Sequence, residues 1–118
     1  MRYDANGALL ETEIPGLKPV HRGKVRDIYD MGDSLLFVAT DRISAFDCVM
    51  PNGIPDKGRV LTAMSLFWFN LFSWAPNHVL CSDASKFPAV LKSVEKDLAG
   101  RSILVKKAKT IPLECIVR

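Results

Sequence analysis

The sequence has little cysteine, no long apolar run and only a small excess of positive charge. Its three cysteines, Cys48, Cys81 and Cys115, lie far apart and form no Cys-x-x-Cys pair, and the chain has only two histidines. This pattern excludes a zinc framework and a ladder of disulfides. We expect all three cysteines to be small buried apolar residues in a reducing compartment.

The distribution of charged and apolar residues excludes further classes of protein. Residues 1–13 carry one arginine and three acids without an apolar centre, so they are not a signal peptide. The longest apolar stretch, Leu66–Trp74, is interrupted by Asn70 and Ser73 and is too short to span a bilayer. A formal net charge of +3 is too small to indicate duplex nucleic acid. We therefore expect a cytoplasmic protein that binds neither membrane nor nucleic acid.

The composition is that of one globular domain. The 118 residues are 48% hydrophobic and 25% charged, and a chain of this size can bury a core without disulfides or metal. Apolar runs predict short strands at residues 17–22, 25–29, 35–40, 48–50, 79–81, 102–106 and 113–117. The continuous run 35–40 indicates a central strand covered on both faces. Residues 41–47 indicate an irregular loop, and turn signals follow at 51–53 and 55–58.

One segment has a clear helical period. From residue 59 to 74 apolar residues recur every three or four positions, which predicts a helix that ends before Pro76. Because its aromatic residues lie at this spacing, we expect them to pack in the core rather than to bind a cofactor. Residues 84–98 predict a weaker helix, interrupted by Pro88 and ended by Gly100. These elements indicate an α+β fold with one main helix.

The first candidate site is a glycine at a predicted strand–turn–strand. Gly23 would let backbone N–H groups approach a phosphate, and Lys24 and Arg26 would project from one face of a strand. Two cations on one face could hold the phosphates of a nucleotide. The sequence has neither a Gly-x-x-x-x-Gly-Lys-Ser/Thr loop nor a Gly-x-Gly-x-x-Gly fingerprint. By itself, the segment is more simply interpreted as a solvated basic hairpin.

The second candidate site follows the apolar run 35–40, where a sheet would hold a polar loop in place. In this loop Ser44 and Asp47 could bind a substrate that carries a hydroxyl or an amine. The alternative is that Asp41 pairs with Arg42 and that Asp47 caps a turn.

The third candidate site lies at the end of the sequence. Glu114, Ile116 and Arg118 alternate and would share one strand face. An acid and a base on one face can simply pair. Two charges on an apolar strand also indicate a functional role, because burying them without a partner is costly.

Together these segments resemble one enzyme family, in their residues and in their order. The matching stretches are Gly23–Tyr29 (GKVRDIY), Leu36–Asp47 (LFVATDRISAFD), Asn52–Pro55 with Lys57–Gly58, and Ile111–Arg118 (IPLECIVR). They resemble the N-terminal part of the phosphoribosylaminoimidazole-succinocarboxamide synthase (SAICAR synthetase) family of purine biosynthesis. The resemblance covers nearly the whole chain after residue 15, although the stretch between Trp74 and Gly100 carries no motif.

The resemblance implies a fold and a division of the chain. It implies a kinase-like N-terminal ATP-binding lobe with an antiparallel sheet and a helix over residues 1–106. The hinge and the first strand of a central domain would then occupy residues 107–118. Family members are longer, and their Asp-x-Lys-x-Glu-Phe-Gly signature is absent here. We therefore expect a truncated enzyme that is inactive alone, with no metal ligands in this chain and the Mg²⁺ ligands in the missing part.

The activity implied by the resemblance is that of an ATP-dependent ligase. Such enzymes join L-aspartate to carboxyaminoimidazole ribotide and give SAICAR, ADP and phosphate. The resemblance places four residues at ATP: Gly23, Lys24, Arg26 and Lys106. Lys107 would take the place of Lys106 if the strand register shifted by one residue.

The resemblance also assigns residues to the other substrates. Ser44, Asp47 and Arg118 would bind the ribotide or the aspartate. The candidate catalytic residues are Asp47 and Glu114.

Three other functions stay open from the sequence. The chain could be a non-catalytic module that binds ATP or ADP weakly. It could self-associate through an unpaired C-terminal strand and the apolar helix. A protein kinase would also place ATP under a hairpin, but the sequence contains no His-Arg-Asp or Asp-Phe-Gly element.

Overall fold

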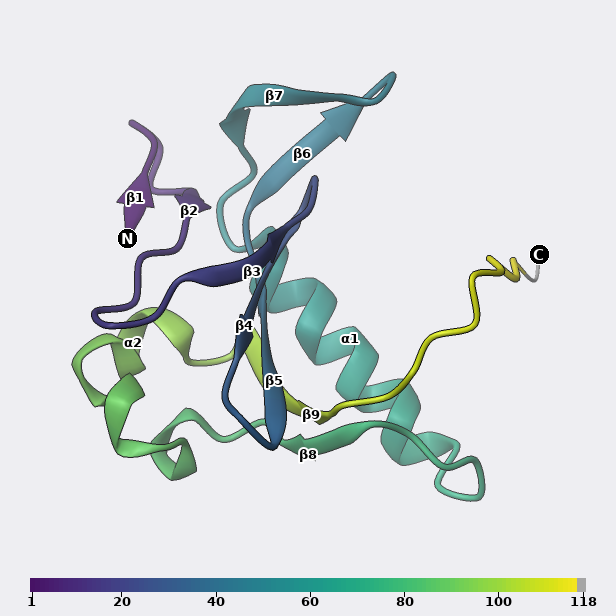
Figure 1. Cartoon of the computed structure of the whole chain (residues 1–118). Coiled ribbons are helices and arrows are strands. Elements are labelled where there is room, and N and C mark those ends of the chain that lie inside the picture. Colours follow the sequence, from purple (N-terminus) through teal and green to yellow (C-terminus); the bar gives the residue numbers. More distant parts are fainter. Residues whose placement is uncertain (117–118) are drawn as a thin grey trace.

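A five-stranded antiparallel sheet forms the centre of the molecule (Figure 1). The computed structural model describes residues 1–116, and the strand order in this sheet is β3–β4–β5–β9–β8. The strands are β3 (Pro19–Arg22), β4 (Arg26–Asp30), β5 (Ser34–Ala39), β8 (Val79–Cys81) and β9 (Ser102–Lys106). The five corresponding predicted strands are confirmed to within about two residues at each end. The expected α+β class with antiparallel sheets is also confirmed.

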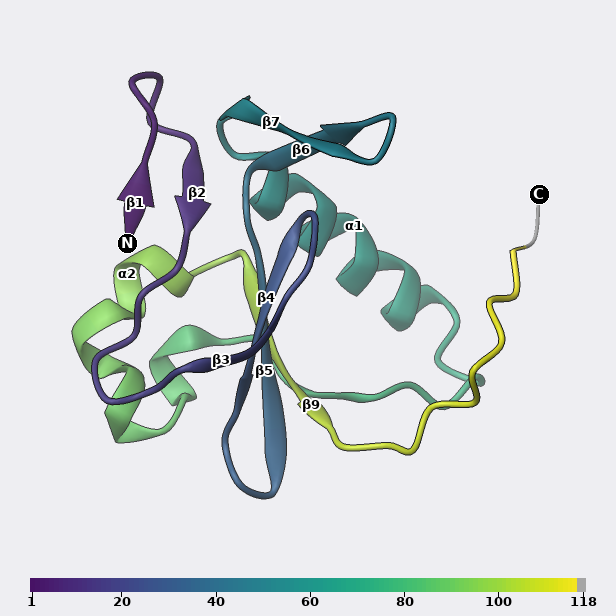
Figure 2. The same cartoon turned by 45° about the horizontal axis from the view of Figure 1, so that its top comes forward.

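Two small hairpins lie beside the central sheet (Figure 2). They are β1 (Arg2–Tyr3) with β2 (Leu9–Glu11), and β6 (Arg42–Ala45) with β7 (Cys48–Gly53). The predicted loop 41–47 and turn 51–53 were therefore wrong, because the second hairpin includes most of both segments. Phe46 and Asp47 form its tight turn with φ of 49° and 64°. Positive φ at both positions gives the twist that joins two antiparallel strands.

The central strand β5 is covered on both faces, as predicted. On one face, Leu36 and Val38 are fully buried against Leu91 and Leu98. On the other face, Phe37 points toward the main helix. The covering segment on the first face is not one weak helix. It forms the 3₁₀ turns η1 (Ala84–Lys86) and η2 (Ala89–Val94) and the short helix α2 (Glu95–Leu98).

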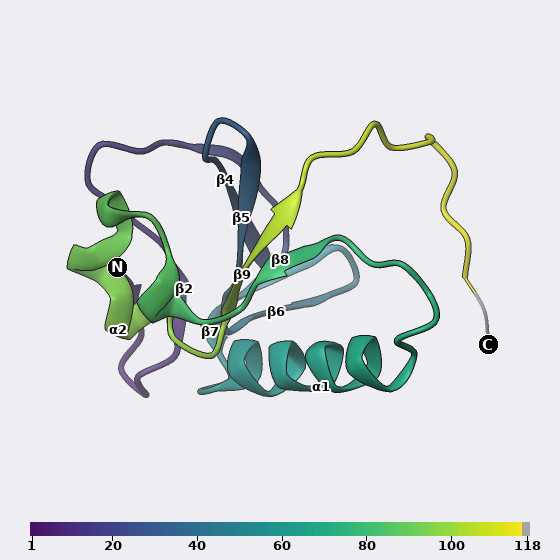
Figure 3. The same cartoon turned by 90° about the horizontal axis from the view of Figure 1, so that it is seen from below.

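The main helix, α1 (Lys57–Leu71), lies along one side of the sheet (Figure 3). Gly58 and Thr62 are buried there, while the aromatic side chains Phe67 and Trp68 are exposed. The prediction that the aromatic stripe belongs to the core was therefore wrong. Apolar residues occur on every side of this helix, so their spacing did not identify the face that contacts the sheet.

Two further predictions differ from the structure. Cys48 and Cys115 are exposed and Cys81 is half-buried, so the cysteines are not core residues. Residues 107–116 run out from β9 without forming a strand, whereas a strand was predicted at 113–117. A strand needs a partner edge for its backbone hydrogen bonds, and this segment leads away from the sheet (Figure 1). No helix within residues 1–116 is long and apolar enough to cross a membrane.

Candidate functional site

The turn at residues 23–25 joins β3 to β4 at one end of the central sheet. Its Gly23 N–H donates to the Arg26 carbonyl at 2.8 Å. Gly23 does not have a positive φ, and a Cβ atom there would approach no neighbour closer than 3.4 Å. Neither the backbone conformation nor the packing of this chain therefore requires glycine at this position.

The turn brings together residues from the first two candidate sites. The Lys24 ammonium forms an ion pair with the Asp47 carboxylate in the turn of the β6–β7 hairpin. Both side chains are largely exposed, and such a pair contributes about 1 kcal/mol at most. Arg26, the first residue of β4, follows this turn and lines a cavity. The structure therefore brings Lys24 and Asp47 together although 23 positions separate them in the sequence, and Arg26 follows Lys24 at the start of β4.

The cavity beside Arg26 lies between the central sheet and α1. Its volume is about 180 Å³, and its walls are mostly apolar, with Phe37 from β5 and Leu61 from α1. Lys57 and Arg101 add two further cations to the lining. Mostly apolar walls with a few charged groups are typical of sites for small organic ligands.

Two buried ion pairs hold the elements around this site. The Arg42 guanidinium lies 2.7 Å from the Asp27 carboxylate, and the Arg101 guanidinium lies 2.9 Å from the Asp41 carboxylate. Asp41 also accepts the Gly58 N–H at 2.8 Å, which joins the start of α1 to the end of β5. The alternative in which Asp41 pairs with Arg42 is therefore wrong, because these adjacent residues form ion pairs with different partners.

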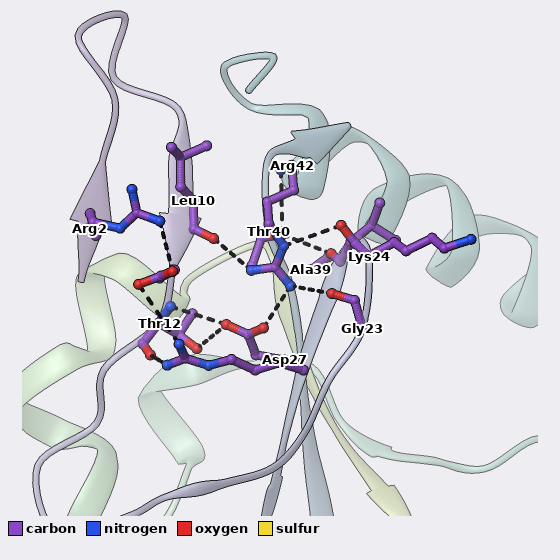
Figure 4. A network of polar contacts seen from close by, with 12 residues as sticks. Arg2, Leu10, Thr12, Gly23, Lys24, Asp27, Ala39, Thr40 and Arg42 are labelled. Atoms are coloured by element: carbon purple, nitrogen blue, oxygen red, sulfur yellow. Dashed lines mark hydrogen bonds and ion pairs between the residues drawn. The ribbon is translucent and has the colours of Figure 1, made fainter. Parts of the chain in front are cut away.

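The Asp27–Arg42 pair belongs to a larger polar network (Figure 4). The second oxygen of Asp27 accepts the Thr12 hydroxyl at 2.6 Å and the Thr12 N–H at 3.1 Å. The Tyr29 hydroxyl lies 2.7 Å from the Thr12 hydroxyl, and burial raises the pKa of Tyr29. This network joins the N-terminal segment to β4 and to Arg42, directly behind the turn.

Sequence reasoning missed Asp27, Arg42, Lys57 and Arg101 as parts of the site. One signal was available, since Asp27 and Arg42 are charged residues within or beside apolar strands. Such residues need buried partners. The sequence does not show which partners these are, because 15 residues separate the members of this pair.

Lys106 lies away from the turn. In the register of the sheet it faces Ser34, at one end of β5, whereas Arg26 faces Ala39 at the other end. Five residues of strand separate these ends by roughly 17 Å. Lys107 forms an ion pair with Asp30 at 2.7 Å, and its ammonium lowers the pKa of that carboxyl. Lys106 is therefore the last residue of β9, and the shift of register that would put Lys107 in its place does not occur.

The remaining predicted site residues are not brought to the turn. Ser44 is half-buried on β6, opposite Val49. Glu114 is exposed in the segment that leads away from the sheet, and Arg118 lies outside the described residues. Among residues 1–116, no group of three or more His, Cys, Asp or Glu side chains could hold a metal ion.

Comparisons with known proteins extend these findings. The model of the family described as SAICAR synthetase matches residues 19–118. The phosphoribosylaminoimidazole-succinocarboxamide synthase of Syntrophobacter fumaroxidans is 60% identical over 111 residues, which are 93% of this chain and 37% of that protein. The protein of the same name from Geobacter metallireducens is 57% identical, with 38% of its length covered. This chain thus spans well under half the length of these relatives.

Solved structures agree with the sequence comparisons. A structure described as SAICAR synthase superposes with a TM-score of 0.79 at 45% identity, over 89% of this chain and 39% of that one. A SAICAR synthase from Saccharomyces cerevisiae, complexed with SAICAR, gives the same TM-score and identity and is covered over 38% of its length. With a family model that matches most of its length, the chain belongs to the SAICAR synthetase family.

Proposed function

We propose that this chain forms the ATP-binding part of a ligase that joins L-aspartate to carboxyaminoimidazole ribotide, with SAICAR, ADP and phosphate as products. The observation that carries the proposal is the turn at residues 23–25, where Lys24 lies two residues before Arg26, a cation that lines an apolar cavity between the sheet and α1. In this proposal residues 1–106 are the kinase-like nucleotide-binding lobe. Residues 107–118 are the hinge and the start of a central domain. The proposed location is the cytoplasm.

The described residues fit ATP. Arg26 and Lys57 line one opening and Lys24 lies on the adjoining turn, and charge-assisted hydrogen bonds are the strong interactions available to phosphates. Arg101 also lines the cavity, but its charge is paired with the buried Asp41 carboxylate. Gly23 would allow close approach of a phosphate, since packing within this chain does not require glycine there. The cavity of about 180 Å³ is smaller than most complete ligand pockets, so it would hold only part of the nucleotide.

Lys24 and Asp47 have linked roles in this proposal. Their exposed ion pair is weak enough to open when a polyphosphate competes for the ammonium. Opening would leave Lys24 on the phosphates and free the Asp47 carboxylate to accept a hydrogen bond from the amine of L-aspartate. Asp47 would therefore position or deprotonate the nucleophile, and Ser44 on the same hairpin would help to orient the substrate.

Other family-derived roles belong to the same proposal. ATP supplies the phosphoryl group that turns a carboxylate oxygen of the ribotide into a leaving group. The chain's own cations would neutralise charge on the transferred group. Glu114 and Arg118 are proposed for the ribotide side, and Lys106 is proposed for the nucleotide near the hinge. Residues 1–116 offer no acidic cluster for Mg²⁺, and the Mg²⁺ ligands are proposed for the part of the enzyme that this chain does not cover.

Calorimetry of the 118-residue chain with ATP tests the proposal. We expect binding in the millimolar range, about 4 kcal/mol, because half of a cleft leaves much of the ligand in water. The double charge reversal Lys24→Glu/Arg26→Glu should weaken ATP binding at least tenfold. The control Lys86→Glu/Lys96→Glu makes the same change of net charge in the segment on the opposite face of the sheet. Absence of heat up to several millimolar ATP, or equal weakening by the control, would contradict the proposal.

The exposed face of α1 favours self-association as a second property. Large apolar side chains are exposed along and just after this helix, namely Val60, Met64, Phe67, Trp68, Leu71, Phe72 and Trp74. Contiguous exposed apolar residues of this size typically mark an interaction surface. Sedimentation velocity over a range of concentrations should show a dimer that is weakened by Phe67→Lys. A monomer at every concentration would reject this property and leave the ATP proposal unaffected.

A further inference from the structure

The buried Arg42 side chain donates hydrogen bonds to the turn at residues 23–25, next to the proposed phosphate-binding residues. Only 7% of Arg42 is exposed, and its guanidinium has four acceptors. Two of these are successive backbone carbonyls of the turn, Gly23 at 2.8 Å from Nη2 and Lys24 at 3.2 Å from Nε. The others are the Leu10 carbonyl at 2.6 Å and the Asp27 carboxylate at 2.7 Å. Figure 4 shows the guanidinium between Leu10 of β2 and the turn.

These two hydrogen bonds to backbone carbonyls determine the direction in which the turn's N–H groups point. A trans peptide is planar, so its N–H points opposite to its C=O, and residues 1–116 contain no cis peptide. The carbonyls of Gly23 and Lys24 converge on Arg42. The N–H groups of Lys24 and Val25, which belong to the same two peptides, therefore point away from it.

Both amides are available to a ligand. Over the described part of the chain, neither the Lys24 N–H nor the Val25 N–H donates to a protein acceptor, whereas the Gly23 N–H donates to Arg26. Successive backbone N–H groups that point to the same side form anion-binding concavities. Lys24 and Arg26 carry side-chain cations in the same stretch of chain, so the backbone and the side chains of residues 24–26 would bind the same anion.

We infer that Arg42 is a positioning residue that holds the Lys24 and Val25 amides toward the phosphate chain of the nucleotide. The inference rests on the proposed ATP-binding function and adds a residue that does not itself touch the ligand. Arg42 is buried and neutralised by Asp27, so it acts through the two carbonyls. Lysine cannot replace it, because a single ammonium lacks the planar fork that donates to several acceptors at fixed angles.

Backbone amide NMR of the ¹⁵N-labelled 118-residue chain tests the inference. Inorganic tripolyphosphate is the probe for the phosphate chain, and adenosine is the probe for the apolar cavity. In the wild type, we expect tripolyphosphate to move the Lys24 and Val25 amide protons downfield, as direct hydrogen bonds to phosphate do. Adenosine should instead move amides around Phe37 and Leu61.

Variants of Arg42 separate positioning from general stability. Arg42→Lys should lose the downfield shifts and weaken tripolyphosphate binding at least fivefold, while the adenosine response stays. Asp27→Asn/Arg42→Met removes both charges of the pair, and it is the variant to measure if Arg42→Lys does not fold. The matched control is Arg22→Lys, since Arg22 donates to the Thr12 carbonyl at 2.8 Å and contacts neither turn carbonyl. This control should keep the wild-type response.

Each outcome decides between the two proposals. If tripolyphosphate shifts other amides of the wild type but not those of Lys24 and Val25, the role of Arg42 is overturned and ATP binding stands. The same conclusion follows if both Arg42 variants respond like the wild type. If ATP, adenosine and tripolyphosphate all fail to shift any wild-type amide, the proposed function fails and the inference fails with it.

Discussion

Replacing Gly58 by alanine should strongly destabilise the fold, because the start of α1 touches the end of β5 without space for a side chain. A Cβ atom at Gly58 would lie 2.2 Å from the Ala39 carbonyl oxygen and 3.1 Å from the Thr40 carbonyl oxygen. To reach an ordinary contact of 3.4 Å, the helix and the strand would have to separate by about 1.2 Å. The contact is with backbone, so no side-chain rotation relieves it.

The size of the destabilisation follows from the hydrogen bond that this separation breaks and the close contact that it strains. The Gly58 N–H donates to the buried Asp41 carboxylate at 2.8 Å, and a hydrogen bond to a charged group contributes about 1.5–3 kcal/mol. Overpacking of a close contact adds roughly 1–3 kcal/mol. Alanine is better than glycine in a helix by up to about 1 kcal/mol, which offsets part of this. We expect Gly58→Ala to lower the free energy of unfolding by about 2–4 kcal/mol, a large share of the 5–15 kcal/mol typical of a domain.

Urea unfolding followed by far-ultraviolet circular dichroism measures this loss. Tryptophan fluorescence is less suitable, because Trp68 and Trp74 are already exposed in the folded chain. The matched control is Gly23→Ala, where the nearest atom to the new Cβ is 3.4 Å away and φ is not positive. It should stay within about 1 kcal/mol of the wild type. A loss below about 1 kcal/mol for Gly58→Ala would refute the contact between α1 and β5 described above.

Three smaller predictions concern the tight turn and the titrating groups. Phe46→Asn should stabilise the chain by about 0.5–1 kcal/mol in the same urea assay, since a bulky residue at φ 49° is strained and asparagine tolerates that region; a loss of stability would contradict it. Burial and a hydrogen bond to Asp97 raise the pKa of Tyr3 to about 12, and burial raises that of Tyr29. The native chain should therefore show little tyrosinate absorbance at pH 10, and the stability contributed by these raised pKa values should disappear as pH rises toward 12; normal titration near pH 10 would reject this. The pKa of Asp4 is lowered by backbone N–H groups of Gly53 and Ala8. Its contribution to the free energy of unfolding should be present above pH 4 and should decrease as pH falls below that value. In Asp4→Asn, the free energy of unfolding should therefore fall less steeply below pH 4 than in the wild type.

The strands of the central sheet were predictable because their sequence pattern is local. The run 35–40 is apolar at every position except its last, which predicted a strand covered on both faces, and β5 lies at the centre of the sheet. The motif residues around Gly23 and Asp47 indicated the family, and the family model confirms it. The sequence also placed Lys24 and Arg26 together on one face of a strand, although it did not connect them with Asp47.

The face of α1 was not predictable, because apolar residues surround the helix. Only the approach of Gly58 to the Ala39 carbonyl and the Asp41 carboxylate determines which side meets the sheet. The stripe that spacing assigned to the core is therefore the exposed side.

The sequence by itself determined the five strands of the central sheet, the main helix and the family of this chain, because periodicity and short motifs are properties of neighbouring residues. Only the tertiary structure decided the partners of the buried charges. Asp41 and Arg42 are adjacent in sequence, yet they pair with Arg101 and Asp27 from other strands or loops. A buried charge takes whichever opposite charge the fold brings within hydrogen-bond distance, and that distance depends on how the strands are arranged.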